Sequence, residues 1–65
     1  MKAVRQLDEV DKRIIHLLKN GFTYKEISSE VYKSVDTINY RIRAMKDHFQ
    51  VKSTIQLISI VEDLK

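Results

Sequence analysis

The sequence contains no cysteine, no proline and no tryptophan, and its only glycine is Gly21. Without cysteine, a disulfide framework and a zinc site built on thiolates are both excluded. Strands are usually joined by turns rich in Gly, Pro and Asn-Gly pairs, so the scarcity of these residues favours helices with short connections. No apolar run approaches the ~20 residues that a membrane span needs, and no apolar core of a signal peptide follows the first charges. We therefore expect no membrane association.

What is present is a short, basic and moderately apolar chain. Its 65 residues include 12 Lys or Arg against 9 Asp or Glu, a formal net charge of +3, and 43% of the residues are hydrophobic. This length allows one domain with a small core. We expect a lead-in segment at residues 1–6, a single domain at residues 7–65, and a cytoplasmic location.

Capping residues and apolar spacing predict four short helices. A helix begins after a side chain that can accept the free backbone N–H groups of the first turn, and Thr23 with Glu26 matches a capping box. Gly at the end of a helix adopts a positive φ without penalty, so Asn20-Gly21 should end the first helix. The predicted helices follow Asp8, Thr23, Ser34, and Ser53 or Thr54, and end near residues 20, 32, 48 and 65.

Each predicted helix has one apolar stripe with a period of three or four residues. The stripe residues are Val10, Ile14, Ile15, Leu17 and Leu18; Ile27 and Val31; Ile38, Ile42, Met45 and Phe49; and Leu57, Ile58, Val61 and Leu64. Val51 should also turn inward. The fold class is therefore a compact all-α, four-helix domain. The short link between the second and third helices is typical of a helix-turn-helix.

From Leu7 to about Val61 the chain resembles the LuxR-type (GerE-like) helix-turn-helix domains of bacterial transcription regulators. The resemblance rests on Gly21-Phe22-Thr23-x-Lys25-Glu26-Ile27, followed by Ser34-x-x-Thr37-Ile38. It implies double-stranded DNA as the partner, and such domains often form the output domain of a response regulator. The sequence departs from the family pattern at Ser28, Val35, Asn39, Gln50 and Ile55; a basic residue is frequent at position 39 and Gly at position 50.

The third helix is the candidate DNA-reading element. In a helix-turn-helix the second helix of the unit enters the major groove, and its N-terminal residues meet base edges. At 100° per residue, Asn39, Tyr40 and Arg43 lie opposite the apolar stripe. Asn pairs with adenine and Arg with guanine, and Tyr can contact a thymine methyl group or a phosphate. These three residues are the predicted base-reading set, and the resemblance implies the same three. Asp36 shares this face and would be repelled by phosphates, although a carboxylate can accept a hydrogen bond from cytosine.

Phosphate contacts are expected from the rim of this surface. Segment 33–54 has five cations and two acids. Its net charge of +3 equals the net charge of the whole chain. Neutralising phosphates supplies non-specific affinity that falls with salt. The predicted phosphate contacts are Lys25, Thr37, Arg41, Lys46 and Lys52.

The last predicted helix carries more apolar residues than one inner face requires. Ile55 and Ile60 are the surplus, which suggests a partner surface. The resemblance implies pairing through this helix, so a homodimer on an inverted repeat is one reading; packing against Ala3 and Val4 is the other.

No catalytic function is expected. His16 and His48 have no companion metal ligands, no nucleophile, base and acid form a set, and the domain is too thin for a substrate pocket. We expect no cofactor, no metal and no small-molecule substrate. The alternative to DNA binding is a helical protein-interaction module, which the modest charge and the uncharged residue at position 39 would suit.

Overall fold

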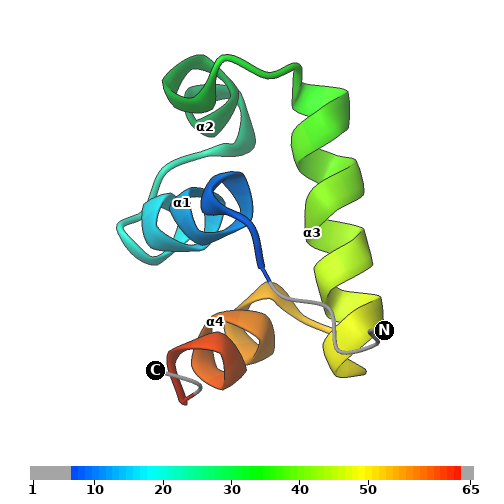
Figure 1. The fold of residues 1–65 in the computed structure, drawn as a ribbon. Helices are drawn as coiled ribbons and strands as arrows, with labels where there is room; N and C mark the ends of the chain where they lie inside the picture. Colours follow the sequence, from blue (N-terminus) through cyan, green and yellow to red (C-terminus); the bar gives the residue numbers. More distant parts are fainter. Residues whose placement is uncertain (1–6, 64–65) are drawn as a thin grey trace.

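The computed structural model describes residues 7–63, and it contains four helices and no strand within that range (Figure 1). The helices are α1 (Glu9–Lys19), α2 (Tyr24–Val31), α3 (Val35–Phe49) and α4 (Thr54–Asp63). The all-α prediction is confirmed, including the helix-turn-helix formed by α2 and α3. The expected lead-in at residues 1–6 and the stripe residue Leu64 lie outside the described residues.

Side chains cap the starts of the helices as predicted. The carboxylate of Asp8 accepts a hydrogen bond from a backbone N–H of the first turn of α1. At α2, the Glu26 N–H donates to Thr23 Oγ1 at 3.2 Å and the Thr23 N–H donates to Glu26 Oε1 at 2.9 Å, which is a complete capping box. Ser34 caps α3, and Ser53 Oγ accepts from the Gln56 N–H in the first turn of α4. Glu26 therefore has the structural role expected for it.

Three helices end with the backbone in the left-handed region. Gly21 after α1 has φ +88°, Tyr32 after α2 has φ 59°, and Gln50 after α3 has φ 57°. In each case the next N–H donates to a carbonyl five residues earlier, for example Val51 to Lys46 at 3.0 Å. This closure satisfies carbonyls that would otherwise lack a partner at the helix end. Glycine was expected at the first of these ends; Tyr32 and Gln50 adopt the same conformation despite their side chains.

The core is formed by one apolar stripe from each helix. Nine hydrophobic side chains are buried: Ile14, Ile15, Leu17, Ile27, Ile38, Ile42, Met45, Leu57 and Val61. All belong to the predicted stripes. Phe49 and Val51 pack against this cluster and are half-buried.

The arrangement leaves one side of α3 uncovered. Figure 1 shows α1 between α2 and α4, with α3 running alongside all three at one edge of the molecule. The Lys19–Glu62 ion pair also joins α1 to α4. We call the side of α3 that faces away from the other helices the outer face.

Candidate nucleic-acid interface

The outer face of α3 carries the three predicted base-reading residues. Asn39, Tyr40 and Arg43 are exposed, and Tyr40 keeps 72% of its surface accessible although it is aromatic. The opposite side of the helix buries Ile38 and Ile42. An amide, a phenol and a guanidinium are therefore presented together on one surface of a rigid helix. These groups match the hydrogen-bonding edges of bases.

The turn between α2 and α3 consists of Tyr32, Lys33 and Ser34, and it positions the start of α3. Ser34 Oγ accepts from the Thr37 N–H at 3.1 Å and lies 3.0 Å from the Thr37 hydroxyl. The cap thus also orients Thr37, which is half-buried on the flank of α3. Lys33 is exposed here and was not among the predicted phosphate contacts. The position of Lys33 in the link just before α3 could have indicated it as a further phosphate contact.

The three predicted phosphate-binding lysines come from three different parts of the chain. Lys25 is exposed in the first turn of α2, Lys46 is half-buried near the end of α3, and Lys52 is exposed in the link to α4. Within residues 7–63, none of these three forms an ion pair with a carboxylate. Their charges are therefore not neutralised by described neighbours.

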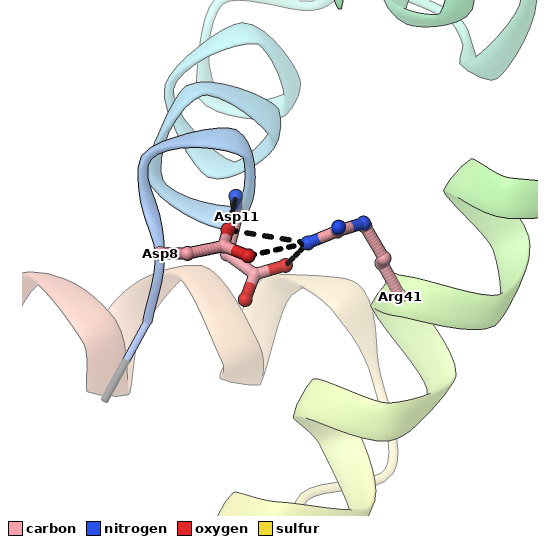
Figure 2. Close-up of polar contacts among 3 residues, drawn as sticks. All are labelled: Asp8, Asp11 and Arg41. Atoms are coloured by element: carbon pink, nitrogen blue, oxygen red, sulfur yellow. Dashed lines mark hydrogen bonds and ion pairs between the residues drawn. The ribbon is translucent and has the colours of Figure 1, made fainter. Parts of the chain in front are cut away.

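Arg41 is placed differently from the other predicted contacts. Its Nη1 donates to Asp8 Oδ1 and Oδ2 at 3.1 and 2.9 Å, and to Asp11 Oδ1 at 3.0 Å. Figure 2 shows the side chain crossing from α3 to the first turn of α1. Because Arg41 follows Tyr40 by one residue, it lies about 100° around the helix from it. The guanidinium thus points toward α1 rather than along the outer face.

The Arg41 cluster, defined as Asp8, Asp11 and Arg41, pairs one guanidinium with two carboxylates. Asp11 is fully buried and the Arg41 side chain is 25% exposed. The hydrogen bonds that Arg41 donates, first to Asp8 and then to Asp11, hold the pKa of Arg41 above its ordinary value. Sequence reasoning missed this cluster. The available signal was that Asp11 falls three, four and seven residues before apolar stripe positions of α1, so that a buried acid needed a partner.

The two predicted dimer residues do not share a face of α4. Ile55 is 80% exposed, whereas Ile60 is half-buried against the core. The two residues are five positions apart, which at 100° per residue places them about 140° apart around the helix axis. Of these two residues, only Ile55 is exposed.

Other kinds of site have little support in residues 7–63. No group of three or more His, Cys, Asp or Glu residues there could hold a metal ion, and no helix there is long and apolar enough to cross a membrane. A shallow hollow of about 430 Å³ lies between α1 and the end of α2. The Arg13–Glu30 ion pair, at 3.5 Å, belongs to its lining. This hollow is built by helices other than α3.

The comparison with protein families gives a match to winged helix-turn-helix DNA-binding domains over residues 7–48. The matched region covers α1, α2 and α3 up to the residue before its end. Curated proteins and solved structures gave no significant match. A wing is a β-hairpin, and residues 49–63 contain α4 and no strand, so the shared part is the three-helix unit with its helix-turn-helix. The match does not extend to the LuxR subtype, which stays a prediction. With well over half of its length matched, the chain belongs to the winged helix-turn-helix DNA-binding family.

Proposed function

We propose that this chain binds double-stranded DNA in a sequence-specific manner and acts in the cytoplasm as part of a bacterial transcription regulator. The single observation that carries the proposal is the outer face of α3, where Asn39, Tyr40 and Arg43 are exposed together. The second helix of a helix-turn-helix enters the major groove, and α3 has this place in the chain.

The base-reading step is assigned to these three side chains. Asn39 pairs bidentately with an adenine and Arg43 with a guanine, while Tyr40 contacts a thymine methyl group or a phosphate. Asn39 and Arg43 are four residues apart, about 6 Å along the helix axis. That separation suits bases that are about two steps apart in the stack. The rigid helix therefore gives a fixed spacing between the two readings.

The docking step is assigned to cations on the rim. Lys25 approaches the backbone from the start of α2, Lys46 from near the end of α3 and Lys52 from the link to α4. Thr37 adds a hydroxyl at the flank. Arg41 is left out of this set because its guanidinium is held by the carboxylates of α1. Neutralising about three phosphates gives a slope of log K against log salt of about −3.

The test uses a duplex selected from a random library at near-physiological salt. Arg43→Ala should weaken binding to that duplex about tenfold to hundredfold, because a bidentate base contact is lost. Lys12→Ala removes one charge from the exposed side of α1 and serves as the matched control, with affinity close to that of the wild-type protein. Fluorescence anisotropy measures both, in a salt series. Unchanged binding by Arg43→Ala and Asn39→Ala, or binding that ignores salt, would contradict the proposal.

A protein-interaction module is the second candidate. The observations that favour it are the modest net charge of +3 and the uncharged Asn39 on the outer face. A modest net charge attracts DNA only weakly at long range. Absence of any shift with a random duplex pool, together with a protein partner lost on mutation of α3, would favour this function.

A further inference from the structure

Asp36 is the acidic residue of the outer face nearest the start of α3. It lies in the first turn, two residues after the capping Ser34, and its side chain is exposed. At 100° per residue, Asn39, Tyr40 and Arg43 all lie within about 60° of it around the helix. Any surface that contacts those three side chains therefore meets the carboxylate as well.

The carboxylate of Asp36 has no described neighbour that neutralises it. Among residues 7–63 it takes part in no ion pair, and its oxygens accept no hydrogen bond. The cap of α3 is supplied by Ser34 instead. Its charge is therefore available to whatever approaches the outer face.

An ionised carboxylate only accepts hydrogen bonds, and this restricts what it can face in a major groove. Phosphates repel it. Guanine presents two acceptors and thymine an acceptor and a methyl group, so both leave it unpaired. Adenine offers its N6 donor beside the N7 acceptor, whereas cytosine offers the N4 donor alone. Cytosine is the base edge that suits the group best.

We propose that Asp36 is a specificity-determining residue that selects cytosine at one position of the bound sequence and acts largely by rejecting guanine and thymine. Specificity is commonly built from such unfavourable contacts with the wrong partner. This inference rests on the proposed function, since it requires α3 to lie in the major groove. The competing role is local: an acid in the first turn stabilises a helix through its dipole without touching DNA.

The experiment is selection from a random duplex library with the wild-type protein, Asp36→Asn and Asp36→Ala. Asp47→Asn is the matched control, because Asp47 is an exposed acid on the same face of α3, 11 residues or about 16 Å further along the axis. Circular dichroism confirms that every variant is folded before selection. The base preferences at each position are then compared.

In the wild-type protein we expect one cytosine that is favoured about tenfold or more over guanine and thymine. Asp36→Ala should lose that preference, and Asp36→Asn should move it to adenine, the base that Asn reads. Asp47→Asn should keep the wild-type preferences. The inference is overturned if Asp36→Asn selects the wild-type sequence at every position, or if Asp47→Asn produces the same change.

The outcomes also separate this inference from the proposed function. If the folded wild-type protein enriches no sequence at all, both fail. If it enriches a sequence that depends on Arg43 while both Asp36 variants leave every base preference unaltered, only the cytosine selection by Asp36 fails.

Discussion

Arg41 and Arg43 lie two positions apart on α3 and carry the same charge, yet their surroundings differ. Arg43 is exposed on the outer face, whereas Arg41 is held by Asp8 and by the fully buried Asp11. Burying a carboxylate is costly unless it is paired and hydrogen-bonded. Position around the helix therefore gives one arginine a structural role and leaves the other exposed for the proposed DNA contact.

Removing Arg41 should destabilise the fold. We expect Arg41→Met to lower the free energy of unfolding by about 2–3 kcal/mol, less than the 3–5 for a fully buried pair because the Asp8 end is half-exposed. Urea unfolding followed by circular dichroism measures this. Arg43→Ala is the control and should change stability by less than about 0.5 kcal/mol.

A second substitution distinguishes the buried charge from lost packing. Arg41→Met combined with Asp11→Asn should be more stable than Arg41→Met alone, because the buried carboxylate that has lost its Arg41 partner is gone. A double variant that is less stable than Arg41→Met would show that loss of the Arg41–Asp11 ion pair does not cause the destabilisation.

The raised pKa of Arg41 means that folding favours its charged form. Its contribution is thus complete at neutral pH and is lost only as the pH rises through the folded-state pKa, far above neutral.

At the scale of helices, two of the turns contain residues in a conformation that suits glycine. Tyr32 and Gln50 have φ of 59° and 57°, and Tyr32 is 92% exposed. A side chain in the left-handed region costs about 1 kcal/mol. The hydrogen bonds that close these helix ends hold both residues there.

Glycine at these two ends should stabilise the domain. We expect Tyr32→Gly and Gln50→Gly each to raise the free energy of unfolding by about 0.5–1 kcal/mol, after the added freedom of the unfolded chain is allowed for. Thermal and urea unfolding measure the change. Ser59→Gly, at an exposed position inside α4, is the control and should destabilise by about 0.5 kcal/mol. Destabilisation by all three would mean that positive φ is not the controlling factor.

Most of the local structure could be predicted because its causes are local. Caps such as Thr23 with Glu26 act over three residues, and the apolar stripes repeat within each helix. The Arg41 cluster joins residues 30 and 33 positions apart, so it depends on how α1 packs on α3. The left-handed Tyr32 and Gln50 carry no side-chain signal for that conformation. The exposure of Asn39, Tyr40 and Arg43 followed from helix periodicity, while their contact with DNA stays a prediction.

At the scale of the whole molecule, the question is whether two copies bind together. Ile55 is the large aliphatic side chain that α4 leaves exposed, with 80% of its surface accessible, and α4 lies beside the end of α3. A two-fold pair joined through α4 would present two α3 helices to an inverted repeat. The half-burial of Ile60 limits this surface to one side of α4.

Replacing Ile55 should distinguish the binding of two joined copies from the binding of a single copy. We expect Ile55→Ser to keep the wild-type affinity for a duplex with one half-site, and to lose at least about tenfold on a duplex with two half-sites. Titration of both duplexes, with sedimentation to count bound copies, measures this. Equal affinities for the wild-type protein on both duplexes would show that the copies bind independently.

The Arg41 cluster also has a practical consequence for anyone who joins another protein to this one. The carboxylate that caps the first turn of α1 also accepts a hydrogen bond from Arg41 in the middle of α3, so we expect a displacement of Asp8 to affect the helix proposed to bind DNA. A bulky tag should therefore be attached through a long, pliant spacer on that side. We expect a rigid fusion there to perturb α3 while every residue of its outer face stays the same.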